Sequence, residues 1–381
     1  MDINRAKIKN FKSLKDVDIN LSNLNLLTGV NSSGKSSFIQ ALLLLKQNYQ
    51  VMMNNILFGQ EMIVKAFNND DNPNPNFEKM ALSIDDGEYV KVNANEIFFE
   101  ESYDEDIGIS IFSNGTNTFE LKFKKDLSFS ASGTNRFNIF KSDFQYIQTN
   151  RITPDILYRL SNKHIEKNIL GTQGEYTAHY LSVNRHKNIL ETLRHKESQT
   201  AQLLENVSLW LGEISENIEV KAKVYEELQS VDLKYTYTYG KTTTQDFTPL
   251  NVGFGITYVL PIITAILKAK KGDLIIIENP ETHLHPKAQS KIAMLCSIAA
   301  ANGIQIILET HSDHVLNGIR VATKEEILKP EQSKIYYFRR DKDNLETKID
   351  QINIDNNGAI DRYPKGFFDQ FDEDLDRLVV W

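Results

Sequence analysis

A glycine-rich segment near the beginning of the chain has the residue types and spacing of a phosphate-binding loop. The sequence GVNSSGKS, from Gly29 to Ser36, fits the pattern G-x-x-x-x-G-K-[ST]. Its glycines allow a tight turn in which successive N–H groups face the β-phosphate of a nucleotide. Lys35 would reach the β- and γ-phosphate oxygens, and the Ser36 hydroxyl would ligate Mg²⁺. The predicted nucleotide-binding residues are Asn31, Ser32, Ser33, Gly34, Lys35, Ser36 and Ser37.

Two apolar runs with polar residues at their ends complete the expected chemistry. The run LIIIE ends in Glu278, which we predict holds the Mg²⁺ shell. A lone acid after an apolar run is common, so this prediction depends on the glycine-rich loop. The run IQIILET is followed by His311, whose imidazole could contact the γ-phosphate and sense its presence. The alternative is a capping or surface histidine, and the position of His311 after the two phosphate motifs favours the sensor.

The elements around the glycine-rich segment have the order that a phosphate site requires. Alternating apolar residues over 3–21 predict short strands, and the apolar run 24–27 predicts a buried strand. After Ser36 the sequence SFIQALLLLKQNYQ has strong helix formers and neither Gly nor Pro, which predicts a helix. This strand–loop–helix context disfavours a chance glycine-rich turn.

The middle of the chain contains two further segments. From 51 to 144 the sequence is rich in Asn, Asp and Glu, with an exposed loop expected at 68–76. Short β-prone runs predict an antiparallel subdomain there. From 154 to about 230 the pattern becomes helical, with apolar residues at three- and four-residue spacing from Leu203 to Ile214. The β-prone runs are 81–84, 89–92, 96–99, 107–112 and 119–124.

The predicted helical segment carries many basic residues. We interpret them as a solvated helix face, with contact to nucleic-acid phosphates as the alternative. They are Arg151, Arg159, Lys163, Lys167, Arg185, Lys187, Arg194 and Lys196.

The last part of the chain alternates helices with apolar strands from about Ile256. This alternation predicts a mostly parallel sheet flanked by helices, and hence an α/β fold. The predicted segments are an N-terminal lobe with the antiparallel subdomain at 1–150, a helical insertion at 151–240, a C-terminal lobe at 241–345 and a tail at 346–381.

The composition sets the class of protein. The chain has 381 residues, 41% hydrophobic and 25% charged, which is typical of a soluble globular protein of two to three domains. The single cysteine, Cys296, lies in an apolar helical run and indicates a reduced, intracellular protein. We see no signal peptide and no membrane-spanning run, so we expect the cytoplasm. A net charge of -8 argues against a uniformly basic surface for nucleic acid but allows a local basic groove.

Five segments together resemble the ABC-type ATPases of the SMC, RecF and OLD (overcoming lysogenization defect) group. The resemblance implies a P-loop fold of the ABC-ATPase type that binds ATP and Mg²⁺. The ending GAIDRYPKGFFDQFDEDLDRL looks like a short C-terminal module of prokaryotic AAA-annotated ATPases of that group. Residues 51–142 are only weakly covered. The five segments are NFKSL, LLTGVNSSGKSS, NVGFGITYVLP, IIIENPETHLHP and ETHSDHVLNGIR.

In this family ATP lies between two subunits, so the resemblance implies a homodimer or a dimer of dimers. A signature segment at 251–258 would face the phosphate loop of the other subunit. Gly253 and Gly255 would permit close backbone approach, and Thr257 would donate its hydroxyl to the γ-phosphate. Without the resemblance, VGFG before a helix indicates only a turn and a helix N-cap.

One position departs from the family pattern. In ABC proteins the Mg²⁺-binding acid is followed by a glutamate that activates the attacking water, whereas Glu278 is followed by Asn279. An amide can orient water but cannot accept its proton at neutral pH. Glu281 is the alternative base. We therefore predict ATP binding with slow hydrolysis.

Three features have competing interpretations. The sequence HLHP at 283–286 occupies the place of the loop that crosses the ABC dimer interface, and metal binding by its histidines is disfavoured because no Cys or His cluster joins them. Asp341 and Asp343 resemble a metal pair, but a charged loop is the favoured interpretation. The tail from Phe367 to Leu375 alternates apolar and acidic residues, which favours an amphipathic helix docked on its own body over a partner-binding segment.

Three functions fit these observations. The first is an ATP-driven switch that controls a separately encoded effector, a nuclease or toxin, a context that the resemblance connects with bacterial antiviral defence. The second is a repair or maintenance ATPase that acts directly on DNA. The third is an OLD-type nuclease, which is disfavoured because the chain after His311 is too short for a metal-binding catalytic domain.

Overall fold

The computed structural model describes most of the chain and divides it into two compact units. The described residues are 3–58, 87–92, 96–99, 106–113, 117–124, 129–133, 144–341 and 343–379. Unit 1 comprises Met1–Ser22, Thr28–Lys141 and Tyr336–Gln351, and unit 2 comprises Asn23–Leu27, Ser142–Ile335 and Ile352–Trp381. Both units are therefore discontinuous in sequence. Within the described ranges, no helix has the length and apolar character that crossing a bilayer requires.

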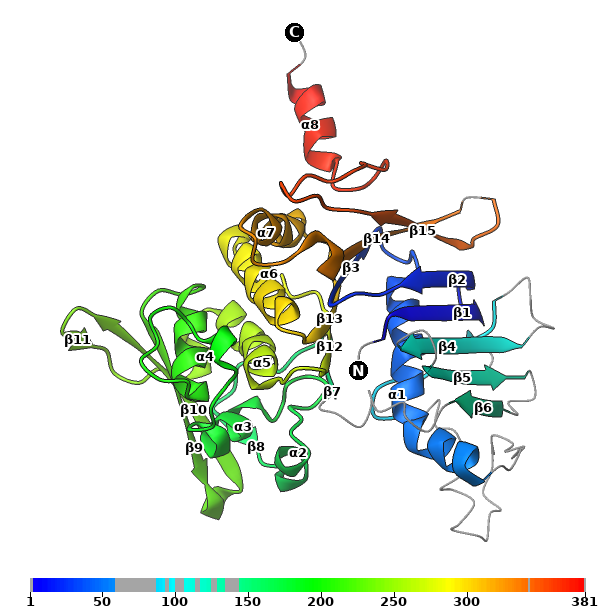
Figure 1. Ribbon diagram of the computed structural model, residues 1–381. Helices are drawn as coiled ribbons and strands as arrows, with labels where there is room; N and C mark the ends of the chain where they lie inside the picture. Colours follow the sequence, from blue (N-terminus) through cyan, green and yellow to red (C-terminus); the bar gives the residue numbers. More distant parts are fainter. Residues whose placement is uncertain are drawn as a thin grey trace. The chain divides into compact units, whose positions relative to one another are not determined.

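Unit 1 contains a five-stranded antiparallel sheet and a long helix. In β1, Arg5, Lys7 and Lys9 are exposed and alternate with the buried Ala6, Ile8 and Asn10, so the alternation predicted from the sequence is confirmed. Helix α1 (Lys35–Phe58) runs along one face of the sheet (Figure 1). The strands, in the spatial order β2-β1-β4-β5-β6, are β1 (Arg5–Phe11), β2 (Leu14–Asn20), β4 (Ile107–Ser113), β5 (Asn117–Phe123) and β6 (Phe129–Gly133).

The predicted antiparallel subdomain is confirmed in part. The runs 107–112 and 119–124 lie in β4 and β5, which pair with each other, and β4 also pairs with β1. The runs 89–92 and 96–99 form no strand, and only Phe98 makes an isolated bridge, to Phe11. In the sheet, the neighbour of β4 on this side is β1, so neither run lies between β1 and β4. The run 81–84 and the loop 68–76 lie outside the described residues.

Unit 2 contains four parallel strands, of which the sequence predicted all but β7. β12 pairs in parallel with β7 on one side and with β13 on the other, and β13 pairs in parallel with β3. The first four residues of each of these strands are buried, as expected for a parallel sheet. The strands are β3 (Leu24–Gly29), β7 (Phe144–Ile147), β12 (Leu274–Glu278) and β13 (Gln305–Glu309).

Three helices accompany these strands (Figure 1). α5 packs on β7 and β12, α6 packs on β13, and α7 packs on α6. Their bounds are α5 (Phe254–Lys268), α6 (Pro286–Ala301) and α7 (Asp313–Lys324). The whole sheet has the order β15-β14-β3-β13-β12-β7, with β14 (Ser333–Arg340) and β15 (Thr347–Ile352).

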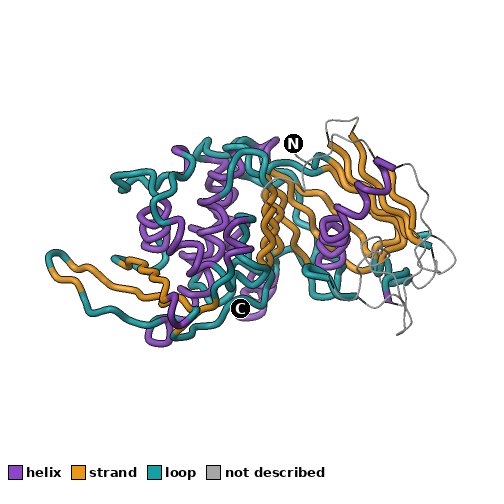
Figure 2. The backbone as a smooth tube through the Cα atoms, turned by 90° about the horizontal axis from the view of Figure 1, so that it is seen from below, coloured by secondary structure: helices purple, strands orange, loops and turns teal. Residues whose placement is uncertain are grey.

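The segment at 151–240 is not wholly helical. The predicted apolar face from Leu203 lies on α4, where Leu203, Val207 and Leu211 are buried. The expectation of helix up to 230 was wrong, because β9 and β10 form an antiparallel hairpin there (Figure 2). In β9 buried and exposed residues alternate with a period of two, which suits a strand. The elements are β8 (Leu157–Arg159), α2 (Asn162–Glu166), α3 (Thr177–Asn184), α4 (Leu203–Gly212), β9 (Ile218–Tyr225), β10 (Ser230–Tyr239) and β11 (Thr242–Thr243).

The tail ends in α8 (Gln370–Leu378), an amphipathic helix as predicted. The expectation that it docks on its own body was wrong for the helix. Phe371 is 71% exposed and Leu378 is 79% exposed, whereas Phe367, before the helix, is buried against the rings of Tyr363 and Phe368. The packed part of the tail is therefore the turn that precedes α8.

The centre of β12 should be a main source of stability in unit 2. Ile276 is fully buried, so Ile276→Ala should lower the free energy of unfolding by about 2–5 kcal/mol through lost burial and a residual cavity. Leu228→Ala is the control, because Leu228 is 64% exposed and should change stability by less than about 0.5 kcal/mol. Denaturant titration of both variants checks the difference, and equal effects would contradict the assignment of this core.

Candidate nucleotide-binding and hydrolysis site

The glycine-rich loop has a backbone that only glycine allows at its two fixed positions. Gly29 has φ +138° and Gly34 has φ +104°, in a region that other residues rarely adopt. A Cβ at Gly29 would lie 2.0 Å from the Phe338 carbonyl oxygen, and a Cβ at Gly34 would lie 2.4 Å from Thr347 Oγ1. The loop is therefore packed tightly against β14 and β15 within unit 1. Its shape is set by the fold.

Lys35 lies inside this loop. Its side chain is 3% exposed, and Nζ donates hydrogen bonds to the Gly29 carbonyl at 2.9 Å and the Val30 carbonyl at 3.0 Å. The ammonium group is thus held by the first two carbonyls of the loop. Among the described residues the buried Ser33 hydroxyl has no hydrogen-bond partner, while the Ser33 carbonyl accepts from Thr347 Oγ1 at 3.0 Å. An unsatisfied hydroxyl and an ammonium group within one loop suit an anionic ligand.

The other residues of the loop differ in their exposure to solvent. Asn31, Ser32 and Ser36 are exposed and Ser37 is half-buried. Ser32 has φ +59°, so the loop alternates backbone conformations in the manner of an anion-binding nest. α1 begins at Lys35, and the helix N-terminus therefore directly follows the loop. These positions fit the phosphate groups of a nucleotide.

Glu278, at the end of β12, is held by β7 and by the segment that follows it. Its Oε1 accepts a hydrogen bond from Tyr146 Oη at 3.0 Å, and its Oε2 accepts from the Thr149 N–H and from Thr149 Oγ1, both at 3.2 Å. Burial, together with the Glu278 charge, raises the pKa of Tyr146, so the phenol stays protonated and remains a donor. The carboxylate is thus oriented before any cation binds.

Asn279 occupies a position with a backbone requirement of its own. Its φ is +44°, a left-handed conformation that Asn, Asp and Gly tolerate better than Glu. The Asn279 N–H donates to the Glu309 carbonyl at 2.8 Å, and the Asn279 carbonyl accepts from Thr282 Oγ1 at 2.9 Å. An asparagine here therefore has a structural reason in addition to any chemical role.

Glu281 connects this turn to the end of β13. Its Oε2 accepts from Thr310 Oγ1 at 2.8 Å, and its Oε1 accepts from the His311 N–H at 2.8 Å. Both carboxylate oxygens of Glu281 thus accept hydrogen bonds from the segment that carries His311. His311 itself is exposed. Ser312 caps α7 by accepting from the Val315 N–H at 3.2 Å. The structure therefore brings Glu278, Asn279, Glu281 and His311 to one edge of the unit 2 sheet.

The predicted signature residues have three different environments. Gly253 is the exposed N-cap of α5, with nothing within 4 Å of a Cβ built on it. A Cβ at Gly255 would lie 2.4 Å from the His283 carbonyl oxygen, so this glycine serves packing within the chain. Thr257 is 1% exposed. Its hydroxyl is buried in this chain, and the predicted donation by Thr257 to a partner's nucleotide stays a prediction.

The histidines of HLHP have packing and capping roles. The His283 ring contacts those of Phe254 and Tyr258, with centroids 4.7 and 4.9 Å away. His285 caps α6 by accepting from the Lys287 N–H at 3.4 Å. Within the described ranges, no group of three or more potential ligands forms a metal cluster.

The acidic pair near the end of β14 forms a local turn. Asp341 Oδ1 accepts a hydrogen bond from the Asp343 N–H at 2.9 Å. This contact lowers the pKa of Asp341 and favours the interpretation of a charged loop.

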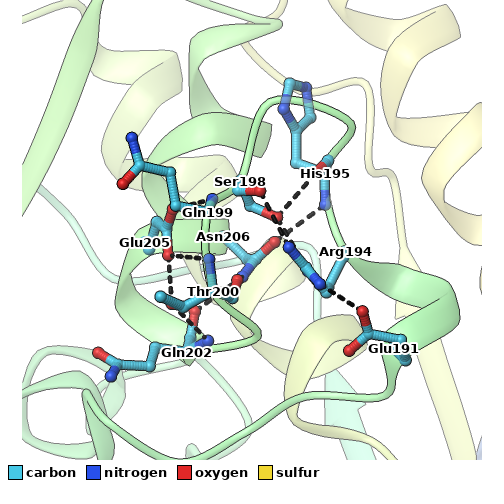
Figure 3. Close-up of polar contacts among 9 residues, drawn as sticks. All are labelled: Glu191, Arg194, His195, Ser198, Gln199, Thr200, Gln202, Glu205 and Asn206. Atoms are coloured by element: carbon cyan, nitrogen blue, oxygen red, sulfur yellow. Dashed lines mark hydrogen bonds and ion pairs between the residues drawn. The ribbon is translucent and has the colours of Figure 1, made fainter.

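Two of the eight basic residues are unsuited to contact nucleic acid. Arg151 is 2% exposed. Arg194 is held in a network of local polar contacts, where it binds Glu191 and the Ser198 carbonyl (Figure 3). In the same network Asn206 accepts from the His195 N–H and fixes the turn before α4. The exposed residues that remain are Arg159, Lys163, Lys167, Arg185, Lys187 and Lys196.

Sequence reasoning missed the residues that surround Glu278. Tyr146 and Thr149 come from the end of β7, and Arg151 donates from Nη2 to the Glu278 carbonyl and, at 2.9 Å, to the Asn279 carbonyl. The available signal was the short apolar run FQYI before a polar segment. In a parallel sheet such a run places the residues after it at the edge where the other strands end.

The backbone of the loop leads to a testable contrast between two glycines. Gly34→Ala should destabilise the protein by about 1–3 kcal/mol and weaken nucleotide binding, because of its positive φ and the contact with Thr347. Gly212→Ala is the control. Gly212, at the end of α4, has open space around its Cβ position, so alanine should be neutral or stabilise by up to about 1 kcal/mol. Thermal unfolding and titration with a fluorescent ATP analogue measure both effects, and a neutral Gly34→Ala would refute this account of the loop.

Comparison with known proteins gives a family for most of the chain. Residues 1–316 match the family described as AAA ATPase domain, and residues 328–378 match the family described as protein of unknown function (DUF3696). No curated protein matches the sequence.

Solved structures resemble the fold. An SMC head bound to the C-terminal winged-helix domain of ScpA has a TM-score of 0.52 at 13% identity, with 93% of this chain and 98% of that chain covered. The SMC head domain from Thermotoga maritima has a TM-score of 0.46 at 12% identity, with 92% and 98% covered. An SMC head domain from Pyrococcus furiosus, bound to the C-terminal domain of ScpA, has a TM-score of 0.48 at 12% identity, with 99% of both chains covered.

The first of these structures shows that the chain has a P-loop ATPase fold similar to that of SMC heads, which agrees with the expected fold class. The family match extends over the glycine-rich loop, Glu278 and His311. The chain belongs to the AAA ATPase domain family.

Proposed function

We propose that this chain is an ATP-binding and ATP-hydrolysing switch of the ABC type, which assembles as a homodimer or a dimer of dimers in the cytoplasm and controls a separately encoded effector protein. The effector class that we propose is a nuclease or toxin of an antiviral defence system. The observation that carries the nucleotide part is the loop from Gly29 to Ser37, in which glycine geometry, the buried Lys35 and the unsatisfied Ser33 hydroxyl converge.

The same proposal assigns Mg²⁺ to Ser36 and Glu278. A hydroxyl and a carboxylate are the oxygen donors that Mg²⁺ takes from P-loop ATPases. When bound, the ion would neutralise charge on the β- and γ-phosphates. Glu278 suits this role because Tyr146 and Thr149 already fix its carboxylate.

Hydrolysis would depend on Asn279, Glu281 and His311. We assign Asn279 the orientation of the attacking water and His311 the sensing of the γ-phosphate. Glu281 is engaged by Thr310 and the His311 N–H, so its contribution would be to place His311. Without a side chain dedicated to proton abstraction, hydrolysis should be slow.

The dimer part of the proposal involves the N-terminus of α5. Gly253 and Asn251 are exposed there, and the first N–H groups of a helix favour an anionic partner. Gly255 and Thr257 would stabilise this turn through their packing within the chain. A separate protein partner is supported by analogy, since the similar SMC head was solved in complex with ScpA.

ATP should drive assembly, and Lys35 should be required for it. Lys35→Ala removes charge-assisted hydrogen bonds to phosphate, so ATP affinity should fall by about 10- to 100-fold and ATP-dependent assembly should be lost. Mass in solution with and without ATP and Mg²⁺ measures assembly, and phosphate release is followed in the same samples. Lys241→Ala, at an exposed turn, is the matched control and should behave as wild type. Assembly that does not respond to ATP would refute the switch.

Adding duplex DNA to the same samples tests whether the partner is DNA or an effector protein. The six exposed basic residues of the insertion favour DNA as the second candidate partner. If the ATP-bound form retards duplex DNA in a salt-dependent way, and charge-neutral variants of Lys163 and Lys167 abolish this, the chain acts on DNA directly. If DNA has no effect on phosphate release or mass, the protein effector is favoured.

Asn279 can be tested without disturbing the backbone. Asn279→Gly removes the amide but tolerates φ +44°, so a loss of phosphate release by about tenfold would assign about 1.4 kcal/mol to the amide. Asn279→Asp introduces a carboxylate that can accept a proton and should raise the rate. An unchanged rate in Asn279→Gly would mean that asparagine is present for its backbone conformation alone.

A further inference from the structure

The side chain of Arg151 is the most unusual buried group in unit 2. It is 2% exposed, and burial lowers its pKa to about 10, so it remains a cation at neutral pH. Among the described residues, Nε and Nη1 have no hydrogen-bond partner. A buried cation without full hydrogen bonding is costly, which points to a role beyond filling space.

One end of Arg151 holds main-chain oxygen atoms at the end of β12. Nη2 donates to the carbonyls of Glu278 and Asn279. The carboxylates of Glu278 and Glu281 are close enough to favour the charged guanidinium. The guanidinium therefore restrains the two peptide groups that set the direction of the Asn279 side chain, in a turn that is already left-handed.

The other face of Arg151 lies on α5. Its guanidinium carbon is 5.3 Å from the centroid of the Tyr258 ring, and the main-chain N–H of Arg151 donates to Tyr258 Oη at 3.3 Å. The Tyr258 ring in turn packs against His283 and Phe254, and Phe254 is 41% exposed on the first turn of α5. A continuous set of ring and cation contacts thus connects the exposed start of α5 with the turn at Asn279.

We propose that Arg151 is a positioning residue for ATP hydrolysis, which fixes the Asn279 turn and, through Tyr258, makes the geometry of that turn depend on the position of the first turn of α5. A change at the α5 N-terminus, such as contact with the second subunit, moves the Tyr258 ring and with it the guanidinium. The peptide groups of Glu278 and Asn279 follow. This inference rests on the proposed function for its catalytic consequence, but the restraint on the turn is a property of the chain alone.

The experiment compares two variants of each residue in the full-length protein. Arg151→Lys keeps the charge but cannot donate to both carbonyls and stack on the ring at once. Tyr258→Leu removes the ring, whereas Tyr258→Phe keeps it and loses only the hydroxyl. We expect Arg151→Lys and Tyr258→Leu to lower kcat by about tenfold with KM for ATP changed less than about twofold, and Tyr258→Phe to retain most of the activity.

A second readout does not depend on hydrolysis. Hydrogen exchange of the Asn279 and Thr282 amides should become faster in Arg151→Lys, because the first donates to Glu309 and the second to Asn279 within the restrained turn. Tyr258→Leu should show the same change even if Arg151→Lys fails to fold. The wild type could neither bind nor hydrolyse ATP while amide exchange in the Asn279 turn still becomes faster in the variants. In that case the proposed function is refuted, but the restraint of the turn by Arg151 is supported. Unchanged exchange and unchanged kcat in the folded variants would overturn the inference.

Discussion

The arrangement of the site depends on the register of the parallel strands in unit 2. Ile277 pairs with Ile147, Glu278 with Glu309, and Glu309 with Leu27, so β7, β12, β13 and β3 end at one level. Each strand is followed by a segment with polar chemistry, and the glycine-rich loop follows Leu27 by two residues along the chain. A slip of one residue in any pair would turn the terminal side chains to the other face of the sheet. The register therefore decides which side chains can meet.

Much of this frame could be predicted from the sequence. The apolar runs ending at Leu27, Glu278 and Glu309 were long and uniform enough to identify buried strands, and the helices α1 and α6 between them have neither Gly nor Pro in their interiors. β7 was missed because four residues give almost no periodicity. The β9–β10 hairpin was missed because the helical spacing of apolar residues from Leu203 to Ile214 was extended to about 230, beyond the end of α4. Local sequence does not contain the pairing that makes such a segment a strand.

The details of the site were less predictable, because they depend on contacts between distant segments. The fitness of Glu278 as a ligand depends on Tyr146 and Thr149, which are about 130 residues away in sequence. The burial of Thr257 and of Arg151 follows from packing of α5 and could not be inferred from residue type, since both residues are usually found at surfaces. Sequence motifs identified which residues could act. Packing then decided which of them can reach a ligand.

The left-handed conformation of Asn279 has an evolutionary consequence. A position with φ +44° between two restrained peptide groups admits few side chains without strain, chiefly Gly, Asn and Asp. A lineage with this turn could gain an acid next to Glu278 as aspartate through one substitution, whereas glutamate would first require the turn itself to change. The rate of the chemical step in such proteins is therefore constrained by a backbone dihedral angle as well as by the chemistry of the side chain.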